Sequence, residues 1–271
     1  MRIKVNQSWI SAKQIGPADA EDVVLITGFI GVSSFWDPVI AFLSEKYRVT
    51  IFDQRGTGSS GVFDTPLSMQ QMVNDAERII DSLCGKPVHL IGHSAGSGIS
   101  LILAQRRPET VKSMTLLAGW TNADVWMQRV FDARLNTLKN IGPNAYTQLT
   151  TLFMIPPADV SLHNMELKNT EEAYAEHMPV YEDIKNRAEA VLKFNSNKYS
   201  DGVTCPSLVI GAKDDVMTPF YFSEELSYSL PNSQLYTLET GGHYFPRTRA
   251  EQTIEPVIDF LNKCAFDVSV N

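Results

Sequence analysis

The sequence predicts an α/β fold in which a mostly parallel sheet, with helices on both faces, is interrupted by a helical insertion. Short continuous apolar runs bounded by glycine or proline are typical of strands buried on both faces of a parallel sheet. Segments with helical periodicity lie between these runs, and alternating strands and helices indicate a doubly wound sheet. One long segment, 121–200, contains no convincing strand run.

Six apolar runs are the expected strands. They cover residues 23–26, 47–52, 88–91, 114–117, 208–210 and 235–238. The stretch 68–83 is an example of the helices expected between them, because Met69, Met72, Ile79 and Ile80 recur mostly at three- and four-residue spacing. This alternation of strand and helix is the basis for the predicted sheet.

The segment 121–200 is predicted to be a helical cap. Apolar residues recur at helical spacing in 130–153, the stretch 171–194 also indicates helix, and prolines punctuate the segment. A single crossover helix needs far fewer residues, so we expect 121–200 to be inserted into a core formed by 1–120 and 201–271. A run of ordinary crossover helices is the alternative.

The composition excludes several classes of protein. The chain has 271 residues, of which 44% are hydrophobic and 20% charged, as in an ordinary globular protein. Its formal net charge of −8 argues against nucleic-acid binding, which needs a basic surface. The three cysteines are widely spaced and indicate neither a disulfide framework nor a zinc site. No signal peptide and no run of about 18 apolar residues is recognisable, so we expect a cytoplasmic protein.

The most informative motif is G-x-S-x-G, which covers residues 92–96 and lies between a strand and a helix. A strand that turns sharply into a helix strains its central residue, and the residues two positions away on either side must be small. Ser94 would therefore stand at the carboxyl edge of the sheet, at a helix N-terminus, as a nucleophile. A glycine-rich turn with a capping serine is the alternative.

A nucleophilic serine needs a base and a carboxylate. Of the five histidines, His243 follows the last apolar run and two glycines, which would let a loop place its imidazole over the sheet edge. The carboxylate fixes the tautomer of the base and stabilises its cation. Asp214 and Asp215 both follow the run 208–210; we predict that Asp214 is the partner of His243, with Asp124 as a weaker rival.

An oxyanion needs two backbone N–H donors that are already in place. Ala95, at the start of the helix after the motif, is one candidate. The loop after the run 23–26 should supply the other, and we predict that Phe29 is this donor while Gly28 gives the backbone room to turn. A glycine-rich loop that merely closes the strand is the alternative.

These segments together resemble the α/β-hydrolase superfamily over nearly the whole chain. The landmarks are 27–29, 53–60 (DQRGTGSS), 92–96, 211–219 and Gly242-His243. The order Ser94, Asp214, His243 is also that of the superfamily. The stretch 53–60, the short cap and the tripeptide 118–120 are most similar to 3-oxoadipate enol-lactonases and to the aminoacrylate hydrolases of pyrimidine breakdown.

One departure from the superfamily concerns the loop that carries the oxyanion donor. Many relatives have His-Gly before the donor, whereas this chain has Thr27-Gly28. The backbone donor should survive this change. The side-chain contacts beneath the loop must therefore differ from those of the relatives.

The substrate pocket is expected where the cap covers the sheet edge. We expect Gly28, Trp120, Trp126 and Phe153 to contact the substrate. Aromatic residues at helical spacing more commonly form the interior of a cap, which is the alternative for these aromatics. Arg129 and Arg134 are candidates to bind a substrate carboxylate, although solvated helix faces explain both equally well.

We therefore predict a serine hydrolase that cleaves a small carboxylic ester, lactone, amide or carbamate through an acyl-enzyme. Neither a phosphate-binding glycine loop nor a metal-ligand cluster is recognisable, so no cofactor and no metal are expected. The expected partner is a small-molecule substrate, with no nucleic acid or membrane, and the chain should be a monomer or homodimer. A cofactor-free C–C hydrolase or perhydrolase, and a ligand receptor with residual hydrolysis, are the alternatives.

Overall fold

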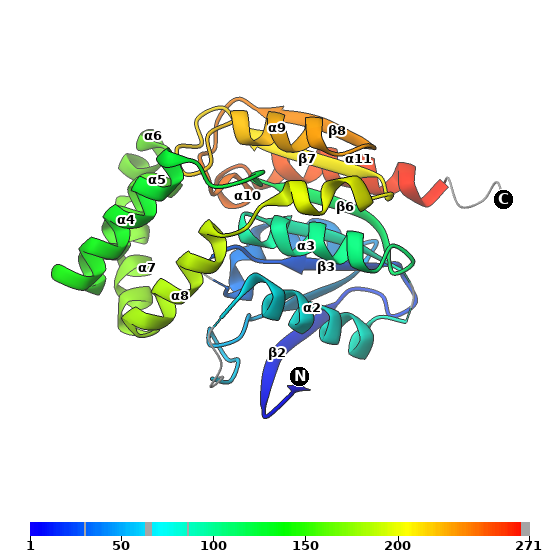
Figure 1. Cartoon of the computed structure of the whole chain (residues 1–271), viewed down its shortest axis with the longest axis horizontal. Helices are drawn as coiled ribbons and strands as arrows, with labels where there is room; N and C mark the ends of the chain where they lie inside the picture. The colour runs from blue at the N-terminus through cyan, green and yellow to red at the C-terminus, as the bar shows by residue number, and fades with distance from the viewer. Residues whose placement is uncertain (30, 63–66, 86, 267–271) are drawn as a thin grey trace.

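The computed structural model describes residues 1–29, 31–62, 67–85 and 87–266. Within these residues the centre is an eight-stranded sheet with the order β1-β2-β4-β3-β5-β6-β7-β8 (Figure 1). The strands are β1 (Arg2–Val5), β2 (Ser8–Ile15), β3 (Asp22–Ile26), β4 (Arg48–Phe52), β5 (Val88–His93), β6 (Val111–Leu117), β7 (Ser207–Ala212) and β8 (Ser233–Leu238). Strands β3 to β8 are parallel, whereas β2 is antiparallel to both β1 and β4. The predicted fold class is confirmed.

The antiparallel pair at one edge of the sheet was not expected from the sequence. The strands β1 and β2 are joined at Asn6-Gln7, where Asn6 adopts a φ of 52°, a conformation that asparagine tolerates better than most residues. Of their side chains, Val5, Ile10 and Ala12 are buried. The apolar signal of both strands is therefore weaker than that of the buried parallel strands.

Helices cover both faces of the sheet. On one face lie α2 (Met69–Leu83), α3 (Ala95–Arg106) and α9 (Tyr221–Ser229), and on the other α1 (Asp37–Ser44), the short α10 (Phe245–Thr248) and α11 (Ala250–Phe266). Successive strand residues point to opposite faces, so Val24 and Ile26 join one apolar cluster while Val23 and Leu25 join the other. The two clusters together form the core around the sheet.

Five helices lie between β6 and β7, a segment that is described throughout. They are α4 (Val125–Asn140), α5 (Pro143–Met154), α6 (Pro157–Leu162), α7 (Asn164–Glu176) and α8 (Tyr181–Leu192), followed by the short 3-10 helices η2 (Ser196–Lys198) and η3 (Ser200–Gly202). In Figure 1 the helices α4–α8 lie together at one end of the sheet, on the left. A bridge between Asn122 and Asn195 joins the two ends of the segment.

The helices α4–α8, called the cap helices below, share an interior with one face of the sheet. Met127, Phe131 and Ala188 belong to the same apolar cluster as the side chains of α2 and α3. Local signals start these helices: Asp124 accepts a hydrogen bond from the Met127 N–H (2.9 Å), and prolines occupy the first turns of α5 and α6. None of the helices in the described ranges has the length and apolar character needed to cross a bilayer.

Candidate active site

Ser94 lies at the sharp turn between β5 and α3. Its φ of 52° and ψ of −118° are strained values for a residue other than glycine. Hydrogen bonds hold the turn, because the Ser94 N–H donates to the Leu117 carbonyl oxygen (2.8 Å) and the Ser97 hydroxyl donates to the carbonyl oxygens of Gly92 (2.8 Å) and Leu117 (3.0 Å). The turn therefore presents the serine at the carboxyl edge of the sheet.

The glycines of this turn are required by close packing. A Cβ atom on Gly92 would collide with the backbone of Gly96, and a Cβ atom on Gly96 would collide with the carbonyl oxygen of Ile26. Gly28, in the loop after β3, is also close, since an added Cβ would lie 2.9 Å from the Cβ of Ser94. The loop after β3 therefore approaches the serine directly.

His243 is held by Asp215. The Nδ1 atom of His243 lies 2.8 Å from Asp215 Oδ2 and 3.1 Å from the hydroxyl of Thr218. That hydroxyl is 2.9 Å from the same Oδ2, and the N–H groups of Met217 and Thr218 donate to Oδ1 (2.8 and 2.9 Å). The imidazole and the carboxylate are both buried. A proton on Nδ1 is thereby fixed toward the carboxylate, which leaves Nε2 of a neutral ring as the basic nitrogen.

Asp214 does not make the contact predicted for it. The sequence prediction paired Asp214 with His243, but the structure places Asp215 there. Asp214 instead accepts hydrogen bonds from the hydroxyl of Thr240 (2.5 Å) and the N–H groups of Gly241 (3.1 Å) and Gly242 (2.8 Å). The two adjacent side chains leave the end of β7 in different directions, so one meets the imidazole and the other supports the loop that carries it.

The rival carboxylate, Asp124, lies elsewhere. It caps the N-terminus of α4 and accepts a hydrogen bond from the hydroxyl of Tyr221 (2.6 Å). One of its oxygens thus caps a cap helix, and the other joins that helix start to α9. The structure does not bring Asp124 to His243.

His93 was not expected to have a part in the site, yet it supports His243. Its Nε2 lies 2.8 Å from the carbonyl oxygen of His243 and its ring stacks on Phe35, with 4.5 Å between the centroids. Because a carbonyl oxygen only accepts, Nε2 must donate. Burial, and then the neighbouring His243, hold the pKa of His93 well below its ordinary value, so the ring is neutral. The only signal in the sequence is its position next to Ser94.

A polar network lies beneath the loop after β3. The side-chain amide of Gln54 donates to the carbonyl oxygen of Thr27 (2.6 Å) and lies 3.4 Å from that of Gly28. Arg187, from α8, donates to Gln54 Oε1 (2.5 Å) and to the carbonyl oxygen of Arg55 (2.9 Å). Burial lowers the pKa of Arg187 to about 10. A cap helix therefore supports the loop that holds Phe29, and the sequence had not indicated this link.

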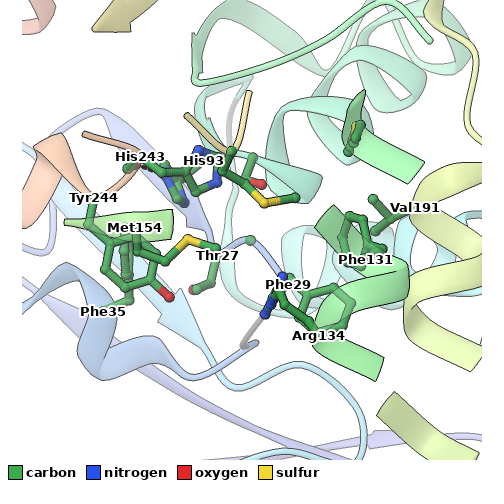
Figure 2. Close-up of a pocket in the computed structure, with 14 residues that line it drawn as sticks. Thr27, Phe29, Phe35, His93, Phe131, Arg134, Met154, Val191, His243 and Tyr244 are labelled. Atoms are coloured by element: carbon green, nitrogen blue, oxygen red, sulfur yellow. Dashed lines mark hydrogen bonds between the residues drawn. The ribbon is translucent and has the colours of Figure 1, made fainter. Parts of the chain in front are cut away.

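Ser94 and His243 line one cavity with about 440 Å³ of empty space, its open mouth included (Figure 2). The loop after β3 contributes Gly28 and Phe29 to its wall. The cap helices contribute Met127, Phe131, Arg134, Met154 and Val191. Its wall combines apolar side chains with a few polar groups, which is typical of sites that bind small molecules.

The four residues that were expected to contact the substrate lie in different surroundings. Gly28 lines the cavity, whereas Trp120, Trp126 and Phe153 are not among the described residues of its wall. Trp120 is buried against Phe194, and Phe153 packs against the apolar cluster around α2 and α3. Trp126 is 43% exposed and donates from Nε1 to the carbonyl oxygen of Val216 (2.7 Å). Helical spacing had shown that these side chains recur, not which of them would turn toward Ser94.

Two cysteines, Cys84 and Cys205, lie outside the wall of this cavity. Burial raises the pKa values of Cys84 and Cys205 to about 11, which keeps both as thiols near neutral pH. No group of three or more His, Cys, Asp or Glu side chains in the described ranges is arranged to hold a metal ion.

The fold and the arrangement around Ser94 define a class of protein. Residues 23–247 match a protein family whose description is "alpha/beta hydrolase fold". The chain therefore belongs to this family and is a hydrolase. Among its relatives is a protein of Azorhizobium caulinodans named "Putative carbamate hydrolase RutD", which is 31% identical over 89% of this chain and 91% of its own length. The protein of the same name from Pantoea ananatis is 33% identical over 92% of this chain and 90% of its own.

Solved structures show the same fold. An enol-lactonase from Burkholderia xenovorans LB400 superposes with a TM-score of 0.87 at 21% identity, covering 97% of this chain and all of the other (100%). A thermophilic esterase from Thermogutta terrifontis superposes with a TM-score of 0.83 at 19% identity, covering 97% of this chain and 98% of the other. The resemblance inferred from the sequence is confirmed.

Proposed function

We propose that this hydrolase cleaves a small carboxylic ester, lactone, amide or carbamate through an acyl-enzyme on Ser94. The observation that carries the proposal is the buried Asp215–His243 pair, which meets the strained Ser94 turn at a single cavity. Relatives named as carbamate hydrolases support a substrate in which an acyl carbon bears oxygen or nitrogen.

In the proposed reaction the Ser94 hydroxyl attacks the carbonyl carbon of the substrate while His243 Nε2 accepts the hydroxyl proton. Asp215 stabilises the resulting imidazolium through Nδ1. The N–H groups of Phe29 and Ala95 are the proposed donors to the oxyanion. Phe29 follows Gly28, which lies against Ser94, and Ala95 begins α3. His243 then returns the proton to the leaving group, and a water molecule hydrolyses the acyl-enzyme in the same way.

The proposal requires the Ser94 hydroxyl and His243 Nε2 to come within hydrogen-bond distance. Among the hydrogen bonds of the described residues, none joins Ser94 to the imidazole of His243. Such contacts are commonly long before substrate binds and shorten in the reactive complex. A substrate that fills the cavity would bring the hydroxyl and Nε2 together.

The direct test is Ser94→Ala. With short-chain p-nitrophenyl esters the variant should lose roughly 10³-fold or more in kcat, because the nucleophile is gone. A fluorophosphonate probe should label the wild type on Ser94. The exposed Ser161→Ala on α6 is the matched control and should retain both activity and labelling. Full activity in Ser94→Ala would refute the covalent route, and binding without multiple turnovers would favour a receptor.

A further inference from the structure

Arg134 brings a buried positive charge to the cavity that holds Ser94. It lies on α4, the residue is 3% exposed, and it lines the same cavity as Ser94 and His243. The sequence had left two possibilities for Arg129 and Arg134, namely carboxylate binding or a solvated helix face. Arg129 is exposed on α4, but Arg134 is not, so a solvated face no longer explains Arg134.

The guanidinium is held in place by neutral groups. Its Nε donates to the hydroxyl of Thr150 (3.1 Å) and its Nη2 to the hydroxyl of Tyr146 (2.9 Å), both on α5. Its Cζ lies 5.3 Å from the ring centres of Phe29 and Phe131 and 5.2 Å from that of Tyr146. Figure 2 shows it against the rings of Phe29 and Phe131. The side chain is therefore positioned by contacts that leave its charge without a counterion.

A buried charge is normally paired, because removing it from water is costly. Arg55, another buried arginine, forms a bidentate ion pair with Asp75 at 2.6 Å. Within the described residues no carboxylate forms an ion pair with Arg134. The aromatic rings offset part of the cost of burial through cation–π contacts. The positive charge that remains would attract an anion into the cavity.

Arg134 contacts Phe29, the residue whose N–H group we propose as an oxyanion donor. The Phe29 ring contacts the guanidinium, whereas the Phe29 backbone belongs to the loop against Ser94. A short substrate can therefore reach both groups at once. An arginine fork can donate two parallel hydrogen bonds to a planar carboxylate.

We propose that Arg134 binds the carboxylate of a small substrate whose scissile carbonyl lies at Ser94. The substrate class is a short ester, lactone, amide or carbamate that carries a second, ionised carboxyl group. This inference rests on the proposed hydrolase function and deepens it. Arg134 acts in binding and selection, and the chemistry at Ser94 is unchanged by it.

The test compares two methyl esters of similar size, monomethyl succinate and methyl butyrate, by pH-stat titration of the acid released. The wild type should prefer the charged ester in kcat/KM. In Arg134→Gln the ratio of the two kcat/KM values should fall roughly 10- to 100-fold, the range expected for loss of a charge-assisted hydrogen bond. Arg134→Lys should reduce the ratio less, and the exposed Arg129→Gln on the same helix should retain it.

A second readout is independent of turnover. Calorimetric titration with succinate should show binding to the wild type and weaker binding to Arg134→Gln. No preference of the wild type for the charged ester, or an equal ratio in the wild type and Arg134→Gln, would overturn the role of Arg134 and leave the hydrolase intact. Arg134-dependent binding of succinate without turnover of either ester, and without labelling of Ser94, would support the anion site but refute the proposed hydrolysis.

Discussion

At the scale of single residues, neighbouring side chains have different tasks. Asp215 contacts His243 Nδ1, while Asp214 accepts hydrogen bonds from the loop 240–242 that carries the histidine. One carboxylate thus acts on the imidazole and the other on its backbone. The difference between them can be measured because each can be neutralised separately.

Replacing Asp215 by Asn should lower kcat by roughly 10³- to 10⁴-fold, because His243 loses the anion that stabilises its cation and fixes its tautomer. Asp214→Asn should mainly reduce stability, by about 1–3 kcal/mol, since it weakens hydrogen bonds to the loop. Steady-state kinetics and urea unfolding of the two variants provide the comparison. A larger loss of kcat in Asp214→Asn than in Asp215→Asn would reverse the assignment.

Gly28 is the second residue whose replacement is informative. A Cβ atom at this position would lie 2.9 Å from the Cβ of Ser94 and 3.0 Å from the carbonyl oxygen of His93, so the loop must shift. Because oxyanion donors act only in the correct place, Gly28→Ala should lower kcat by roughly 10²-fold. Melting temperatures measured beside the kinetics separate this loss from unfolding. An alanine variant with wild-type kcat would show that the loop tolerates the shift.

At the scale of elements, one face of α4 determines what the cavity offers to a substrate. Met127, Phe131 and Arg134 follow one another at spacings of four and three residues and all line the cavity. Trp126 precedes this series by one residue, which turns its side chain about 100° away around the helix axis. It is accordingly exposed and bonded to Val216. The face of the helix, and not the aromatic character of the residue, therefore decides contact with the cavity.

Phe131→Ala should change the preference for acyl chains of different length, because it removes an apolar wall of the cavity. We expect kcat/KM for the best of a series of neutral methyl esters to fall by roughly tenfold or more. Trp126→Ala is the matched control and should leave the order of the series unchanged. Equal changes in both variants would mean that the cap acts as a whole rather than through this face.

At the scale of the whole molecule, cap helices and sheet are joined by apolar packing and by buried polar groups. Arg187 links α8 to Gln54, and Gln54 holds the loop after β3. We expect the buried His89 and His93 of the sheet to contribute to the dependence of global stability on pH. Burial is the main cause that lowers the pKa of each ring.

A lowered pKa in the folded state has a definite sign. Below a pH of about 6.5 an unfolded histidine takes up a proton that the folded ring refuses, so the unfolded state binds more protons and stability falls as the pH falls. His89 and His93 can each contribute up to about 1.4 kcal/mol per pH unit in this range. Urea unfolding at several pH values between 7.5 and 5.5 should therefore show a smaller decline for His93→Gln than for the wild type. The exposed His177→Asn should follow the wild type; an identical decline in His93→Gln would contradict this prediction.

Local sequence determined the elements that place the candidate site. The strands β3 to β7 show apolar runs because nearly all of their side chains are buried, whereas the edge strand β8 is largely exposed. The Ser94 turn needs glycine at 92 and 96 because of backbone collisions. Both signals are visible in short stretches of sequence, although the collision that requires Gly96 involves Ile26 on β3. The outer pair β1 and β2 was missed because it buries too few side chains to show a clear pattern.

Only the tertiary structure decided between Asp214 and Asp215, and between Trp126 and Arg134. The sequence cannot distinguish two adjacent aspartates, because their side chains are identical. Their hydrogen-bond partners depend on how the loop after β7 packs against the loop after β8. Periodicity indicates which residues share a helix face, whereas the rotation of α4 toward Ser94 depends on its packing against α5 and the sheet. Such long-range packing leaves no local trace, because the contacts join residues far apart in the chain.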